Sequence, residues 1–160
     1  MKNIKDQMLV IFGASGDLTA RKLLPALYEL HVKDLLPERF CILGAARTLY
    51  SDEEYRTWAD MHIREALKGK EANEETIRTF LQRLFYAAFD STQSAEYVKL
   101  REKIHEVQKQ EQLPDRIIYY LATPPLMYER IPTFLQENQL NHTNAEDGWR
   151  RIIVEKPFGT

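Results

Sequence analysis

Short apolar runs alternate along the chain with longer stretches in which apolar residues recur every three or four positions. A continuous apolar run indicates a strand buried on both faces, whereas spacing by threes and fours is typical of one helix face. Strands are therefore expected over residues 8–12, 40–46, 84–89, 116–122 and 151–155. Helices are expected over residues 16–32, 51–67, 73–82, 90–112 and 126–138. Strands that alternate with helices favour right-handed crossovers, which predicts a doubly wound α/β fold with a mainly parallel sheet.

Local signals refine the helix ends. Ser51 and Glu54 have the spacing of a capping box, which predicts a helix start at that point. Asp90, together with the serine after it, is expected to open the helix over 90–112. Pro25 is expected either to kink the first helix or to divide it in two. The last helix is expected to run through Pro132.

Composition describes an ordinary globular domain. The chain has 160 residues, enough for one domain, with 44% hydrophobic and 29% charged residues. A formal net charge of −2 gives no reason to expect a nucleic-acid partner. Apolar runs are much shorter than a membrane helix needs, and the amino-terminal run is too short for a secretory signal, so the expected location is cytoplasmic. The one cysteine, Cys41, lies in an apolar run and is expected to be a small buried hydrophobe.

A glycine-containing turn follows the first expected strand and opens a helix. Residues 13–22 read GASGDLTARK, in which Gly13 fits the first position of a dinucleotide fingerprint. Ser15 replaces the second glycine and Leu18 the third, while Gly16 supplies the other close turn. Small residues let the backbone approach a pyrophosphate, and the helix start stabilises the anion. A Gly-Lys-Ser/Thr phosphate loop is excluded by the spacing. A glycine-rich turn without a ligand remains the alternative.

The end of the second expected strand bears on the choice between NAD and NADP. NAD-binding folds place an acidic residue there, where it accepts from the ribose hydroxyls. This chain has Arg47 and Thr48 instead. A guanidinium can bind a ribose 2′-phosphate and the hydroxyl can add a contact, which predicts NADP over NAD. A solvated arginine in a surface loop is the alternative.

Two long motifs at opposite ends of the chain resemble a known family. Residues 11–27, IFGASGDLTARKLLPAL, and residues 153–159, IVEKPFG, are similar to segments of glucose-6-phosphate dehydrogenase, and shorter matches at 35–38, 44–47 and 120–125 follow in the same order. The resemblance spans the amino-terminal, coenzyme-binding (Rossmann) portion of that family. It implies oxidation of D-glucose 6-phosphate to 6-phospho-D-glucono-1,5-lactone, with hydride transfer to NADP, in the pentose phosphate pathway.

The resemblance also implies roles for individual residues. The pyrophosphate would lie against the turn formed by Gly13, Ala14, Ser15, Gly16, Asp17 and Leu18. Arg47 and Thr48 would hold the 2′-phosphate, and Ala88 and Phe89 would border the adenosine, with core packing as the alternative for this last pair. Pro124 would lie at the nicotinamide end of the pocket, where a cis bond is possible. Lys156 would reach both the substrate and the nicotinamide.

The chain lacks one part of the family pattern. Hydride transfer needs a general base, commonly histidine, which the family supplies from a carboxyl-terminal domain within a segment that reads RIDHYLGK. That segment does not occur here, so no catalytic residue is expected in this chain, and no metal site is expected either.

We therefore expect residues 1–160 to form an NADP-binding domain that is inactive alone, without the substrate and dimerisation domain. The full-length enzyme is expected to be a homo-oligomer, and the isolated chain to self-associate through exposed apolar surface. The alternatives are a stand-alone NADP-binding module and a structural domain without a ligand. A short-chain reductase is disfavoured because the Tyr-x-x-x-Lys spacing is absent: Tyr97 is followed by Lys99, and Tyr28 by Lys33.

Overall fold

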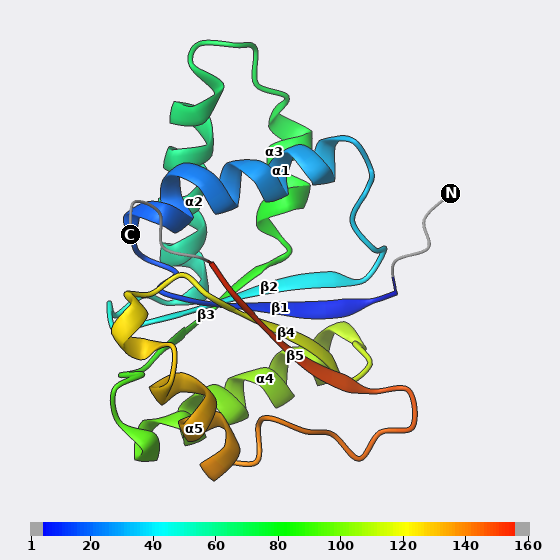
Figure 1. The fold of residues 1–160 in the computed structure, drawn as a ribbon. Helices are drawn as coiled ribbons and strands as arrows, with labels where there is room; N and C mark the ends of the chain where they lie inside the picture. Colours follow the sequence, from blue (N-terminus) through cyan, green and yellow to red (C-terminus); the bar gives the residue numbers. More distant parts are fainter. Residues whose placement is uncertain (1–4, 156–160) are drawn as a thin grey trace.

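The computed structural model describes residues 5–155, which form one sheet with helices on both faces (Figure 1). The sheet has the order β3-β2-β1-β4-β5, and each neighbouring pair is parallel. The doubly wound α/β fold expected from the sequence is confirmed. The strands are β1 (Gln7–Phe12), β2 (Phe40–Ala46), β3 (Leu84–Ala88), β4 (Arg116–Leu121) and β5 (Trp149–Val154).

The helices divide between two layers, seen above and below the sheet in Figure 1. On one face of the sheet, α1, α2 and α3 pack against the strands and form one apolar core. On the other face, α4 and α5 form a second core. These helices are α1 (Leu24–Val32), α2 (Asp52–Leu67), α3 (Glu74–Leu81), α4 (Tyr97–Glu111) and α5 (Arg130–Glu137). Short 3₁₀ turns, η2 (Ser94–Glu96) and η3 (Pro125–Met127), precede α4 and α5.

The apolar runs locate the strands well because the central strands are covered on both faces. Every residue of β2 except the last is buried, and β1 has one residue that is less than fully buried. Cys41 on β2 is 3% exposed, and burial raises the pKa of its thiol to about 12. β5 differs: it begins at Trp149 and ends at Val154, two residues and one residue earlier than expected, and four of its six residues are exposed.

Pro25 does not divide the first helix. The helix widens by one residue over η1 (Thr19–Leu23), a π turn in which the Leu24 amide donates to the Thr19 carbonyl, five residues back. Pro25 has no amide hydrogen and its ring would crowd the carbonyl four residues back, so the wider turn accommodates it. The helix then continues as α1.

Helix starts follow the residues whose side chains cap them. The Ser51 hydroxyl accepts from the Glu54 amide and the Glu54 carboxylate accepts from the Ser51 amide, so the capping box is confirmed. The expectation of a helix start at Asp90 is wrong. Its carboxylate accepts from the amide and hydroxyl of Thr92 and closes a turn instead, so α4 begins at Tyr97.

The last helix also begins later than expected. The chain first makes the turn η3, and α5 starts at Arg130 rather than at residue 126. Pro132 is then the third helical residue, and the amide at that position would have no intrahelical acceptor in any case, so the proline costs no hydrogen bond.

In the described part of the chain, no helix has both the length and the apolar character needed to cross a bilayer.

Candidate functional site

The carboxyl ends of β1, β2 and β4 lie side by side at one edge of the sheet. The crossover from β1 to β2 passes through α1 on one face, whereas the crossover from β3 to β4 passes through α4 on the other. The strand order therefore reverses between β1 and β4. Crevices at such switch points are where doubly wound sheets bind ligands.

Gly13 ends β1 in a conformation that suits glycine. Its φ is +83°, in the left-handed region, and its amide donates to the Ala45 carbonyl over 3.0 Å. A Cβ at this position would lie 2.2 Å from the Ala122 carbonyl oxygen at the end of β4. Gly13 therefore allows the first turn to lie directly against the neighbouring strand end.

The turn then enters the first helix. The Gly16 amide donates to the Gly13 carbonyl, and the Thr19 hydroxyl donates to the same oxygen, over 3.0 Å in each case. The first helical bond runs from the Ala20 amide to the Gly16 carbonyl. The amides of the first helical turn have no intrahelical acceptor and face the strand ends with the positive end of the helix dipole.

Asp17 places a carboxylate in this first turn. It forms an exposed ion pair with Arg21, one turn further along, with 2.9 Å between the guanidinium Nε and the carboxylate oxygen. This pairing offsets the negative charge that would otherwise repel an anionic ligand. The backbone around Asp17, rather than its side chain, is suited to a phosphate.

The loop after β2 carries Arg47 and Thr48, both exposed. The Thr48 hydroxyl lies 3.2 Å from the Ser15 hydroxyl, so a contact joins the loop to the turn after β1. Arg47 is close enough to Asp90 to lower the pKa of that carboxyl, after the larger contributions of the Thr92 hydroxyl and amide. Ser15, Arg47 and Thr48 thus occupy neighbouring turns at the carboxyl ends of the strands.

Two tyrosines hold these turns from beneath, and sequence reasoning missed both. The buried Tyr55 hydroxyl donates to the Ala14 carbonyl over 2.9 Å, and the Tyr86 hydroxyl donates to the Thr48 carbonyl over 2.7 Å. Their rings stack at a centroid distance of 4.7 Å. Burial raises the pKa of both phenols, that of Tyr86 to about 12, so both stay neutral donors. We call Tyr55 and Tyr86 the tyrosine pair.

Gly44 on β2 makes room for the tyrosine pair. A Cβ there would lie 2.8 Å from the Ala14 Cβ and 3.0 Å from the Tyr55 ring. The sequence contained one usable signal: Tyr55, Ala59 and Ile63 recur every four residues on α2, which places a phenol on the buried helix face. A buried hydroxyl normally has a hydrogen-bond partner, so a backbone contact could have been anticipated.

The other expected site residues lie at the same edge of the sheet, in different environments. Ala88 ends β3 and is partly buried. The Phe89 ring is 3% exposed and packs on Phe12 and Tyr97, so only its backbone borders the edge. Pro124 is exposed where η3 begins, and no cis peptide bond occurs within residues 5–155. The prediction for Lys156 lies outside the described residues.

Two histidines of the described region make structural contacts. His31 contacts Thr79 and Arg83, whereas His62 packs on Trp58. Across the described residues, His, Cys, Asp and Glu side chains form no group of three that could hold a metal ion.

The glycine turn, the amide-rich helix start and the switch point define a coenzyme-binding domain of the dinucleotide-binding class. A family described as "Glucose-6-phosphate dehydrogenase, NAD binding domain" matches residues 10–160, and the chain belongs to that family. The family description shows a nucleotide cofactor and names NAD, without specifying NADP.

Individual relatives agree with this assignment. The chain is 43% identical over 152 residues to glucose-6-phosphate 1-dehydrogenase of Aggregatibacter actinomycetemcomitans, and 40% identical over 157 residues to that of Treponema pallidum (strain Nichols). These alignments cover 94% and 98% of this chain and 30% of each relative. A solved glucose-6-phosphate dehydrogenase in complex with glucose 6-phosphate has a TM-score of 0.77 and 30% identity, over 99% of this chain and 32% of that one. The chain therefore spans about 30% of the length of its curated relatives.

Proposed function

We propose that this chain binds NADP at the carboxyl edge of the sheet, with the pyrophosphate on the turn formed by residues 13–18. The observation that carries the proposal is the left-handed Gly13, whose missing side chain lets the amide-rich turn lie against Ala122. An added Cβ at Gly16 would lie 3.2 Å from the Gly13 carbonyl oxygen, so this position is also tight. The residues present fit a dinucleotide.

NADP is favoured over NAD by the chemistry at the end of β2. Arg47 and Thr48 follow Ala46, where an NAD site would need an acidic residue. The Ser15 hydroxyl, 3.2 Å from that of Thr48, adds a second neutral donor beside the guanidinium. A guanidinium with two hydroxyls suits a phosphate dianion, whereas a ribose hydroxyl would leave the charge of Arg47 unused.

In a longer polypeptide this domain would serve the oxidation of glucose 6-phosphate to the lactone, with hydride passing to NADP. Lys156 would bind the substrate, and the general base would come from a further domain, as would the homo-oligomer contacts. The 160-residue chain alone is expected to bind NADP without turnover. The cytoplasmic location and the absence of a nucleic-acid or membrane partner remain predictions.

The test is calorimetric titration with NADP and with NAD. Arg47→Ala should weaken NADP binding about 10- to 100-fold, because a hydrogen bond to a charged group contributes about 1.5–3 kcal/mol, and should leave NAD binding unchanged. Arg39→Ala is the matched control: Arg39 precedes the other end of β2, and its guanidinium donates to the Gln112 carbonyl. Equal affinity for NADP and NAD in the wild type would refute the specificity, and no binding of either would refute the site.

A further inference from the structure

The loop after β2, residues 47–50, carries two side chains of the proposed 2′-phosphate site but has little support from its own backbone. Within residues 5–155, its main chain makes one hydrogen bond, in which the Thr48 carbonyl accepts from the Tyr86 hydroxyl over 2.7 Å. Arg47 and Thr48 are both exposed. Their position therefore depends on a phenol that belongs to another strand, β3.

The same phenol lies beneath the turn after β1. Burial and then Tyr50 raise the pKa of Tyr86, and the Ser15 side chain is close enough to offset part of that rise. The Ser15 and Thr48 hydroxyls lie 3.2 Å apart. One phenol therefore supports both of the turns whose hydroxyls would bind the phosphate.

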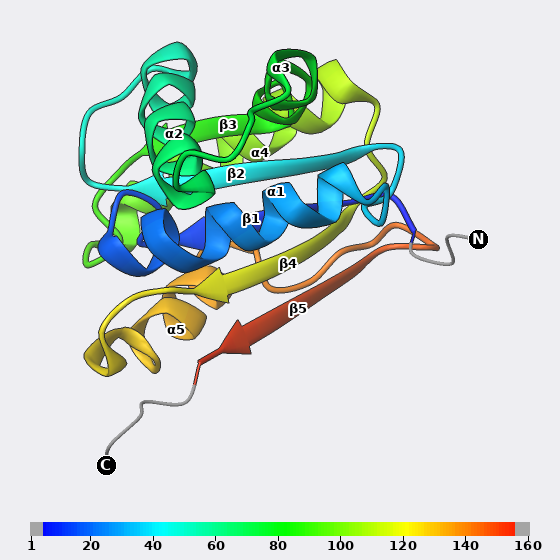
Figure 2. The same cartoon turned by 90° about the horizontal axis from the view of Figure 1, so that it is seen from above.

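Tyr86 is itself held in place from several sides. α2 lies beside β3 (Figure 2), and its Asp52 carboxylate accepts from the Tyr86 amide over 2.8 Å. Lys103 of α4 pairs with Asp52 at 3.0 Å, from the other helical layer. The Tyr55 ring stacks on Tyr86, and the Tyr50 ring meets it edge-on at a centroid distance of 5.5 Å. Because Tyr86 is only 3% exposed, it acts as a buried support and not as a ligand contact.

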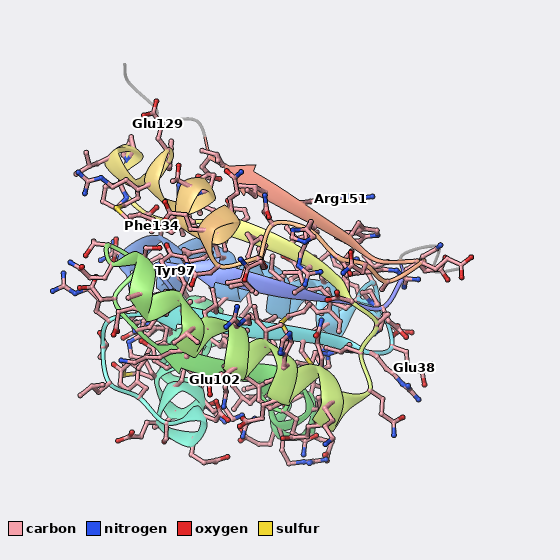
Figure 3. All side chains as sticks on the ribbon, turned by 90° about the horizontal axis from the view of Figure 1, so that it is seen from below. Glu38, Tyr97, Glu102, Glu129, Phe134 and Arg151 are labelled. Atoms are coloured by element: carbon pink, nitrogen blue, oxygen red, sulfur yellow. The ribbon has the colours of Figure 1, made fainter. Side chains whose placement is uncertain are left out.

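Three phenols support the turns after three strands, each by donating to a backbone carbonyl. Tyr55 donates to Ala14 after β1, and Tyr86 donates to Thr48 after β2. On the other face of the sheet, Tyr97 at the start of α4 donates over 2.9 Å to a carbonyl of the turn after β3 (Figure 3). In the proposed site, the first turn binds the pyrophosphate and the third follows the residues expected to border the adenosine, which are groups that NAD and NADP share. The turn held by Tyr86 is the one expected to meet the 2′-phosphate, which NADP alone carries.

We propose that Tyr86 is a positioning residue that makes the site specific for NADP, because its hydroxyl sets the separation between the Ser15 turn and the loop of Arg47 and Thr48. This inference rests on the NADP site proposed above. The phenol holds the loop in place before the coenzyme binds, so the guanidinium and the hydroxyls need little ordering when the 2′-phosphate arrives. Without the hydroxyl the loop loses its backbone anchor, and the affinity lost is that of the 2′-phosphate contacts alone.

Calorimetric titration of Tyr86→Phe with NADP and with NAD tests the inference. The variant keeps the ring stacking and should weaken NADP binding about 3- to 10-fold, since the one hydrogen bond that orders the loop is lost, and should leave NAD binding unchanged. Tyr55→Phe is the matched control, because it removes a buried hydroxyl from the same tyrosine pair, but one whose acceptor lies in the pyrophosphate turn. It should weaken NADP and NAD by the same factor, so the ratio of the two dissociation constants should stay at the wild-type value.

A double variant separates positioning from a general loss of stability. In the Arg47→Ala background, Tyr86→Phe should affect NADP affinity less than it does in the wild type, because the guanidinium that the phenol helps to place is already gone. A merely structural role would weaken NADP and NAD alike in either background. Circular dichroism would confirm that each variant is folded.

The outcomes distinguish this inference from the coenzyme site itself. If the wild type prefers NADP and Tyr86→Phe keeps the wild-type ratio, the role of Tyr86 is overturned and the site stands. An effect of Tyr86→Phe on NADP affinity that is equally large with and without the Arg47 guanidinium also overturns that role. A wild-type chain without a preference for NADP refutes the proposed specificity, and this inference with it.

Discussion

The Tyr55 hydroxyl can be removed without changing the volume of the core. Tyr55 and its acceptor Ala14 are both 0% exposed, and 2.9 Å separates the hydroxyl from the carbonyl oxygen. Tyr55→Phe keeps the stacking on Tyr86 and creates no cavity. It removes one hydrogen bond and leaves a buried carbonyl without that donor, which together should lower the free energy of unfolding by about 1–3 kcal/mol.

Urea unfolding followed by circular dichroism measures this loss. The midpoint should fall while the m-value stays constant, since the surface exposed on unfolding is unchanged. A loss of about 2 kcal/mol corresponds to a drop of roughly 4–8 °C in Tm for a chain of this size. Tyr50→Phe is the control, because Tyr50 packs on the same cluster and its hydroxyl has no hydrogen-bond partner among the described residues. Equal midpoints for Tyr55→Phe and the wild type would refute the reasoning.

Three further perturbations test other parts of the fold. Gly13→Ala should cost about 2–4 kcal/mol in urea unfolding, because the left-handed backbone and the Ala122 carbonyl both oppose a Cβ; an unchanged midpoint would contradict this. Burial, and then the charge of Arg83, lower the pKa of His31 in the folded chain. The unfolded chain therefore binds more protons, and stability should fall as the pH is lowered from about 7.5 to about 5.5. His31→Gln should make stability depend less steeply on pH in this range. A variant with the same pH dependence as the wild type would exclude His31 as its cause. Asp52→Ala should lower stability by about 1–3 kcal/mol in the same assay, since the Tyr86 amide loses its partner; no loss would show that water replaces it.

Sequence patterns located the elements that are buried on both faces. The runs that became β1 and β2 could be assigned because burial on both faces demands uninterrupted apolar residues. The start of α4 could not be assigned, because an aspartate carboxylate accepts from a nearby backbone amide in a turn just as it does at a helix start. The π turn before Pro25 depends on how the proline ring is accommodated, which spacing alone does not determine.

The geometry of the candidate site was predictable where it depends on local backbone chemistry. Gly13 and Gly16 indicate a tight turn, which the structure confirms, whereas the phosphate contact expected of Arg47 stays a prediction. The tyrosine pair was not predictable from spacing, because it acts between elements that are far apart in sequence: 41 residues separate Tyr55 from Ala14, and 38 separate Tyr86 from Thr48. These contacts form only once β1, β2 and β3 are paired.

The same tyrosine pair holds the turn that forms the proposed coenzyme site, and a thermodynamic cycle can test whether it affects binding as well as folding. If the chain binds NADP as proposed, saturating NADP should stabilise the folded state by an amount fixed by its concentration and its dissociation constant. If the Tyr55 hydroxyl only supports the fold, Tyr55→Phe should lose the same free energy of unfolding with and without NADP. If it also positions the Ala14 turn for the pyrophosphate, the loss should be larger with NADP, and NADP affinity should fall by the matching factor. We expect the second outcome, because the hydroxyl holds the turn of residues 13–18 itself. Equal losses, with unchanged affinity in calorimetry, would restrict Tyr55 to stability.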